Sequence, residues 1–175
     1  TELATSVGRT TDNAEAYQYY LIGRWLLMFV GDKRAFRVAR QMFAKAVEID
    51  PEYARAHAGI ATSDCFLMLT SDPTISFEGI FASSRRALEL APELAEAHAA
   101  KGVALDTSGR FAEATVEFEE AIKLDPDSFD ARFFYGRTSL SRTLHEQAIR
   151  LFERAAELQP KDFHSLCFAA MEYVK

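Results

Sequence analysis

One interval recurs along this chain. Pro92, Pro126 and Pro160 follow one another at steps of 34 residues. Five further pairs share this step, namely Gly102 with Gly136, Ala114 with Ala148, Phe118 with Phe152, Ala121 with Ala155, and Leu124 with Leu158. A fixed period of this length marks a structural unit repeated in tandem, whose copies bury their apolar faces against one another. We therefore expect a solenoid of stacked repeats.

Each unit has the pattern of two amphipathic helices. In the clearest unit, a first helix is expected over residues 95–107, and Gly109 and Arg110 form the turn. Apolar residues at three- and four-residue steps then place a stripe on one face of the second helix; they are Ala114, Phe118, Ala121 and Leu124. Proline just beyond a helix ends it, and four pairs mark such ends: Asp50-Pro51, Ala91-Pro92, Asp125-Pro126 and Gln159-Pro160.

The sizes of three residues in this unit have a packing reason. Gly102 and Ala114 allow two helices to approach closely, and Phe118 fills the space below them. Gly, Ala, Phe, Ala and Pro at these offsets resemble the tetratricopeptide repeat, whose period is also 34 residues. Residues 95–128 and 129–162 match this pattern without gaps.

The resemblance implies an all-α fold, a right-handed superhelical solenoid of antiparallel helix pairs with about four repeats and one extra C-terminal helix. The repeats are expected at 16–53, 54–94, 95–128 and 129–162, with a partial repeat at 163–175. They would form a single domain over 13–175, after a flexible segment at 1–12.

Two units are longer than the period. In the first, about four residues are inserted near Val30 to Phe36. In the second, Pro51 and Pro92 are 41 residues apart, and the extra length is expected between its helices, at Thr70 to Thr74. There Asp72 is predicted to cap the second helix, because it precedes a proline at the first helical position. Ser84 replaces the Phe of the other units.

Composition and motifs argue against several classes of function. The net charge of -6 and the lack of a basic run exclude a nucleic-acid-binding face. The apolar run Leu21 to Val30 is too short to span a membrane. Two distant cysteines, Cys65 and Cys167, do not form a disulfide framework, which favours a reducing compartment and a cytoplasmic location.

Catalytic and metal-binding patterns are weak. His57 and His98 occupy equivalent positions, where a packing role is the default. His164 and Cys167 are three residues apart on a predicted helix, but two residues do not make a zinc site. No phosphate-binding glycine loop or nucleophile motif is present. The sequence therefore predicts no active site, cofactor or metal, and favours a non-catalytic module that binds another protein.

The resemblance also implies where a partner would bind. Tetratricopeptide repeats hold an extended peptide in a concave groove lined by the first helix of each unit. The groove positions carried over to this chain are Tyr20, Arg24, Arg55, Thr62, Val103, Phe133, Phe134 and Arg137. Aromatic and Arg residues are common binding hot spots; the alternative is that Phe134 is internal packing and the arginines pair with nearby acids. The Lys and Asn residues of the chaperone-binding carboxylate clamp are absent, since Ala58, Thr62, Ala99, Ala100 and Val103 stand in their places.

Two further hypotheses concern the ends of the chain. The last helix is more apolar than a terminal repeat should be, so Phe168, Met171 and Val174 could form the edge of a homodimer; the alternative is that this helix docks on the preceding hairpin. The first hairpin, with Tyr17, Tyr20 and the Gly23-Arg24-Trp25 run, is similar to repeat regions attached to bacterial signalling and transcription regulators. This likeness implies a regulatory or oligomerising segment of a larger protein, as the alternative to a peptide-binding adaptor.

Overall fold

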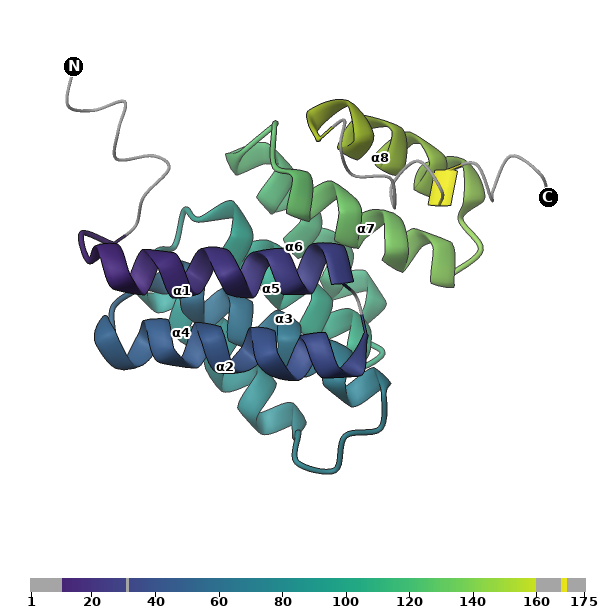
Figure 1. The fold of residues 1–175 in the computed structure, drawn as a ribbon. Helices are drawn as coiled ribbons and strands as arrows, with labels where there is room; N and C mark the ends of the chain where they lie inside the picture. Colours follow the sequence, from purple (N-terminus) through teal and green to yellow (C-terminus); the bar gives the residue numbers. More distant parts are fainter. Residues whose placement is uncertain (1–10, 31, 160–167, 170–175) are drawn as a thin grey trace, which may run out of the picture. The chain divides into compact units, whose positions relative to one another are not determined.

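A computed structural model of the chain describes residues 11–30, 32–159 and 168–169. The helices follow one another as α1 (Ala14–Trp25), the π-helical turn η1 (Leu26–Val30), α2 (Lys33–Ile49), α3 (Ala54–Leu69), α4 (Phe77–Leu90), α5 (Ala95–Thr107), α6 (Phe111–Leu124), α7 (Phe129–Ser141) and α8 (His145–Leu158) (Figure 1). The described part of the chain contains no strand. This confirms the all-α class, and the predicted start and end of the first helix of the clearest unit coincide with those of α5.

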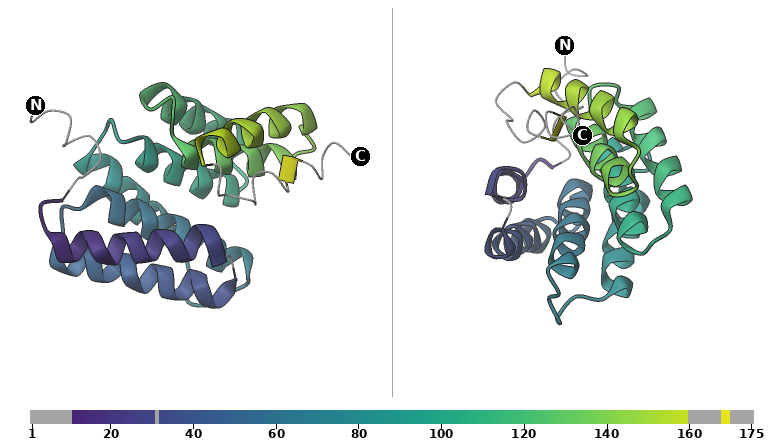
Figure 2. Two further views of the ribbon diagram at one scale, coloured as in Figure 1. Left: turned by 45° about the horizontal axis from the view of Figure 1, so that its top comes forward. Right: turned by 90° about the vertical axis from the view of Figure 1, so that its right-hand side faces the viewer.

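The chain divides into two compact units. Unit 1 is Thr1–Pro92 and unit 2 is Glu93–Lys175. In unit 1, α1 packs on α2 and α3 packs on α4, while α2 also packs on α3. In unit 2 the hairpins are α5–α6 and α7–α8, joined by contacts of α7 with both α5 and α6 (Figure 2). The single domain over 13–175 stays a prediction.

Close approach of the two helices within a hairpin depends on glycine, as predicted for the clearest unit. A Cβ atom on Gly102 would lie 2.8 Å from the ring of Phe118, and one on Gly136 would lie 2.8 Å from the ring of Phe152. Atoms cannot approach this closely without displacement, so the bare backbone makes room for the ring. The small-and-large packing rule is thus confirmed in both hairpins of unit 2.

In unit 1 two glycines, one on each neighbouring helix, make room for a single phenylalanine ring. The buried ring of Phe43 lies between Gly23 and Gly59, where added Cβ atoms would come within 2.8 and 2.6 Å of it. In the α3–α4 hairpin, Ala61 takes the glycine position and the small Ser84 takes the phenylalanine position. Both residues are buried. A smaller partner makes room for the methyl group of Ala61, which explains why the substitution of Ser84 does not disrupt the repeat.

The residues inserted in the first unit lengthen both of its helices, since η1 extends α1 and α2 has 17 residues where α6 and α8 have 14. α1 continues into the π-helical turn η1, which ends at Val30, and α2 begins at Lys33 after its N-cap Asp32. A π-helical turn accommodates additional residues without ending the helix. The backbone amide of Ala35 donates to Asp32 Oδ1 over 2.6 Å, so the cap of α2 is satisfied.

The predicted cap of α4 was wrong. Ser76, and not Asp72, caps this helix, because the Gly79 amide donates to Ser76 Oγ over 3.2 Å. Asp72 instead accepts hydrogen bonds from the amide and the hydroxyl of Thr74, at 3.2 and 2.7 Å. These local bonds hold Asp72 in a turn before the helix, a conformation that aspartate favours as strongly as it favours a cap.

Candidate functional site

The first helices of the two hairpins of unit 2, α5 and α7, pack on each other. They carry four of the predicted groove residues. Val103, Phe133 and Phe134 are buried, and Arg137 is half-buried. Their burial means that this face presents little apolar surface, and that its accessible chemistry is polar.

An aromatic cluster surrounds Phe133. Its ring centroid lies 5.4 Å from that of Phe129, 5.6 Å from Phe134 and 6.1 Å from Phe152. Phe168, in the short described part of the C-terminal segment, lies 6.2 Å from Phe133 and stacks on Phe152 at 5.2 Å. Offset and edge contacts at these distances stabilise a core, so Phe133 contributes to packing inside unit 2.

A polar cluster lies beside these rings. Asp106 projects from α5, and Thr138 and Arg137 project from α7. Burial raises the pKa of Asp106, and a hydrogen bond from Thr138 and the charges of Arg137 and Arg142 oppose this rise. Burial likewise lowers the pKa of the Arg137 guanidinium, which the negative charge of Asp106 opposes. The two charges are therefore held close to each other in a partly dehydrated environment.

One atom of this cluster is unsatisfied. Asp106 Oδ1 is buried and has no hydrogen-bond partner among the described residues, which leaves the bond from Thr138 to the other carboxylate oxygen. A buried acceptor without a donor costs about 1–3 kcal/mol, and native proteins keep few such atoms. Sequence reasoning missed Asp106, although it follows Val103 by three residues and therefore lies on the same face of α5.

In unit 1 the structure brings two of the four predicted groove residues together. The Arg24 guanidinium lies 6.0 Å from the centroid of the Tyr20 ring, at the limit of a cation–π contact. Tyr20 itself is buried, with its ring 5.2 Å from Tyr53 and 5.8 Å from Phe43. Tyr20 is thus part of the core beneath Arg24.

The other two predicted groove residues of unit 1 lie on α3. Thr62 is buried, and its hydroxyl donates to the carbonyl of Ala58 over 3.1 Å. Arg55 is half-buried. Threonine inside a helix often donates its hydroxyl hydrogen bond to the carbonyl four residues earlier. The Thr62 hydroxyl therefore donates within its own helix, and not to a groove ligand.

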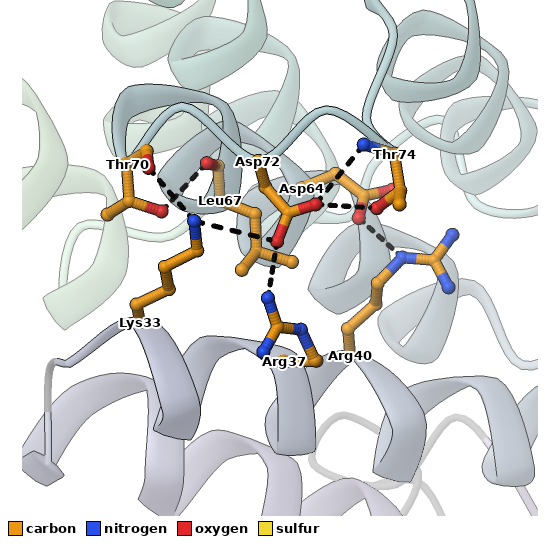
Figure 3. A network of polar contacts seen from close by, with 8 residues as sticks. All are labelled: Lys33, Arg37, Arg40, Asp64, Leu67, Thr70, Asp72 and Thr74. Atoms are coloured by element: carbon orange, nitrogen blue, oxygen red, sulfur yellow. Dashed lines mark hydrogen bonds and ion pairs between the residues drawn. The ribbon is translucent and has the colours of Figure 1, made fainter.

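A second polar cluster braces α2 against α3 and the α3–α4 loop (Figure 3). Arg37 pairs with Asp72 at 2.6 Å, and Lys33 lies 3.9 Å from the same carboxylate. Hydrogen bonds from Thr74 and Arg37 hold the pKa of Asp72 well below its usual range. The Asp72 side chain is almost fully buried. Its ion pair with Arg37 therefore holds the α3–α4 loop, which contains the seven extra residues of this repeat, against α2.

Asp64 forms the other half of this cluster. Arg40 Nε donates to Asp64 Oδ1 over 2.5 Å. Burial raises the pKa of Asp64, opposed by the hydrogen bond and charge of Arg40, and the nearby charge of Asp72 adds to the rise. Neither Arg40 nor Asp64 was predicted from the sequence, where the available signal was that Asp64 is the one acidic residue of α3. Each carboxylate already has a basic partner, which makes the cluster a structural brace.

The histidines have ordinary partners. His57 Nε2 lies 3.0 Å from the carbonyl of Pro51. His98 Nδ1 lies 2.8 Å from Glu117 Oε2, and Lys101 pairs with the other oxygen of Glu117 at 2.6 Å. Within the described ranges no three His, Cys, Asp or Glu side chains could hold a metal ion together. His164 and Cys167, like Met171 and Val174, lie outside these ranges.

Paired helices stacked in this way, with glycine opposite phenylalanine in successive hairpins, define a helical repeat protein. A sequence model described as the tetratricopeptide repeat matches residues 107–167. This match, over about a third of the chain, and the all-helical fold both support a tetratricopeptide repeat assignment. Among the helices described, none is long and apolar enough to cross a bilayer.

Solved structures share the fold at low sequence identity. TTC0263, a tetratricopeptide repeat protein of Thermus thermophilus, aligns with a TM-score of 0.64 and 18% identity over 99% of this chain and 95% of that chain. PilF of Pseudomonas aeruginosa aligns with a TM-score of 0.58 and 23% identity over 91% of this chain and 68% of that one. A MamA protein aligns with a TM-score of 0.53 and 19% identity over 91% and 81%.

No curated protein sequence matches the chain. Nothing in these comparisons supports the alternative of a segment from a bacterial signalling or transcription regulator. The fold is that of a protein–protein interaction module.

Proposed function

We propose that this chain is a non-catalytic adaptor that holds a peptide segment of another protein on the α5–α7 face of unit 2. The observation that carries the proposal is the buried, unsatisfied oxygen Asp106 Oδ1, beside Thr138 and the Arg137 guanidinium. A peptide offers backbone N–H donors for such an acceptor and carbonyl or carboxylate acceptors for a guanidinium. The site thus suits a polar segment of main chain better than a large apolar side chain.

Access to Asp106 Oδ1 requires a side chain to rotate, because the atom lies below the surface. Arg142 is an exposed neighbour, and its guanidinium lies 5.0 Å above the Phe111 ring. Such a contact is worth only about 0.5–1 kcal/mol at an exposed site, so the arginine can move at small cost. A peptide that displaces the Arg142 side chain could then donate a backbone N–H hydrogen bond to Asp106 Oδ1.

Peptide selection tests the proposal. A random peptide library is displayed on phage and selected against the full chain, and the affinity of each selected peptide is measured by fluorescence polarisation. Asp106→Leu, which removes the acceptor, should weaken binding at least about tenfold, in line with a lost buried hydrogen bond. Asp106→Asn, which keeps a carbonyl oxygen at the same place, should retain most of the affinity.

The matched control is Arg150→Ala on α8, an exposed residue that pairs with Glu146 at 3.9 Å. It should leave affinity unchanged. Equal binding by wild type and Asp106→Leu, or a failure to select any peptide, would contradict the proposal. A cytoplasmic location and a homodimer through the C-terminal helix remain predictions of the sequence.

A further inference from the structure

The first helix of unit 1 exposes a row of large apolar side chains. Trp25 is 57% exposed, and its neighbours on α1 and η1 are 41–48% exposed. We define this row as the α1 stripe; its members are Leu21, Ile22, Trp25, Phe29 and Val30. Single exposed apolar residues are ordinary, but a contiguous row on one helix marks an interaction surface.

The next hairpin shows what kind of surface this is. Counted from Gly23 of α1 and Ala61 of α3, Leu21 is equivalent to Gly59, Ile22 to Ile60, and Trp25 to Ser63. In α3 the equivalent residues face the preceding hairpin. Gly59 lies against the Phe43 ring of α2, and Ser63 is fully buried. The α1 stripe therefore occupies the face that receives a helix elsewhere in the same unit, and a helix is the shape that fits it.

Charge at the two ends of the stripe indicates how a second helix would lie. Glu15, in the first turn of α1, is exposed at one end. The other end, beyond η1, carries the exposed Asp32 together with Lys33 and the exposed Arg34 in the first turn of α2, so that basic residues outnumber acidic ones there. If two α1 helices pair antiparallel, each Glu15 lies at the end that carries Arg34 in the other copy. A parallel pair would instead place like charges together, which is unfavourable.

We infer that the α1 stripe is a self-association surface, and that its occupant is the α1 stripe of a second copy packed antiparallel about a two-fold axis. An isologous interface of this kind needs a patch that complements itself, and an apolar centre with one acidic and one basic end meets this condition. Trp25, near the middle, would supply the central aromatic contact that commonly dominates an interface.

The test uses the only tryptophan of the chain. Sedimentation equilibrium of the full chain over a range of concentrations should show the mass rising from one copy towards two. Over the same range the Trp25 emission should shift to shorter wavelength, because the indole leaves water. A monomer mass at every concentration with unchanged Trp25 emission would overturn the inference.

Variants test the surface and its orientation. Trp25→Glu should weaken self-association at least about thirtyfold, the effect of a hot-spot residue. Val116→Glu, an equally drastic change at a 62% exposed position of α6, should leave it unchanged. Glu15→Arg and Arg34→Glu should each weaken it, and the double variant should restore it. Self-association that is insensitive to Trp25→Glu, or no restoration in the double variant, would overturn the antiparallel arrangement. Far-UV circular dichroism checks that each variant is folded.

Discussion

A Cβ atom on Gly102 would lie 2.8 Å from the ring of Phe118, and this ring is fully buried. The ring has no free space into which it can move, so a methyl group at position 102 must push α5 and α6 apart. Overpacking of this kind costs about 1–3 kcal/mol, partly offset by the roughly 1 kcal/mol by which alanine favours a helix over glycine.

Gly102→Ala is therefore expected to lower the free energy of unfolding by about 1 kcal/mol, measured by urea denaturation. Gly79→Ala is the matched control. An added Cβ at Gly79 meets only Ser76 Oγ, at 3.4 Å, which is an ordinary contact. This variant should gain stability from helix propensity, and equal effects of the two substitutions would show that the close approach to Phe118 does not matter.

The start of α4 gives a second prediction. Ser76 Oγ accepts the Gly79 amide, so Ser76→Ala removes the cap and should cost about 1 kcal/mol in urea denaturation. Ser76→Asp keeps an acceptor at the cap and should recover the loss. No loss in Ser76→Ala would mean that another group satisfies the first turn of α4.

Asp72 should make unit 1 sensitive to acid. Its folded pKa lies below its unfolded value of 3.8, so ionised Asp72 stabilises the fold above the unfolded pKa. This contribution is lost as the pH falls below 3.8 towards the folded pKa. Asp72→Asn should lower the melting temperature by a few degrees at pH 7, and the difference from wild type should shrink below about pH 4.

The control for Asp72 is Val116→Ala at an exposed position of α6, which changes no titratable group and should leave the dependence of stability on pH as in wild type. A constant difference between Asp72→Asn and wild type from pH 7 to pH 3 would argue that the ionised carboxylate, held by Thr74 and Arg37, is not the source of the stabilisation.

Asp106 should behave in the opposite way. Burial raises its folded pKa, so the ionised form destabilises the fold above this pKa, and the cost disappears as the pH falls through it. Asp106→Asn removes the charge and should raise the melting temperature at pH 7 relative to wild type. The gain should become smaller as the pH falls towards the unfolded value of 3.8, because wild-type Asp106 takes up its proton in the folded state before it would in the unfolded chain.

A stabilising Asp106→Asn would also bear on function. Residues that cost stability are common where a protein binds its partner. If the substitution instead destabilises the protein at pH 7, the attraction between Asp106 and Arg137 outweighs burial, and Asp106 is a structural residue.

The repeat was predictable from the sequence because its packing rule is local. Gly102, Phe118 and Pro126 recur at one spacing; the first two lie against each other within a single hairpin, and Pro126 follows the end of its second helix. The cap of α4 was not predictable, because Asp72 and Ser76 both have cap chemistry, and the bonds of Asp72 with Thr74 and with Arg37 on another helix are not visible in the sequence. The role of Asp106 was not predictable either, because the lack of a hydrogen-bond partner for its Oδ1 atom depends on the spacing of α5 and α7. Periodicity determines which face a residue occupies, but not which partners reach it.

Phe168 allows the two hypotheses for the end of the chain to be separated. It stacks on Phe152 at 5.2 Å and lies 6.2 Å from Phe133, contacts within the same unit. If these contacts dominate, Phe168→Ala should destabilise the monomer by about 1–3 kcal/mol, somewhat less than for a fully buried phenylalanine because the residue is only half-buried. If Phe168 instead contributes to a dimer edge, the loss should depend on protein concentration, because dissociation then contributes to unfolding. Urea denaturation at two concentrations a hundredfold apart distinguishes these cases. We expect the same midpoint shift at both, since stacking on Phe152 already uses one face of the ring.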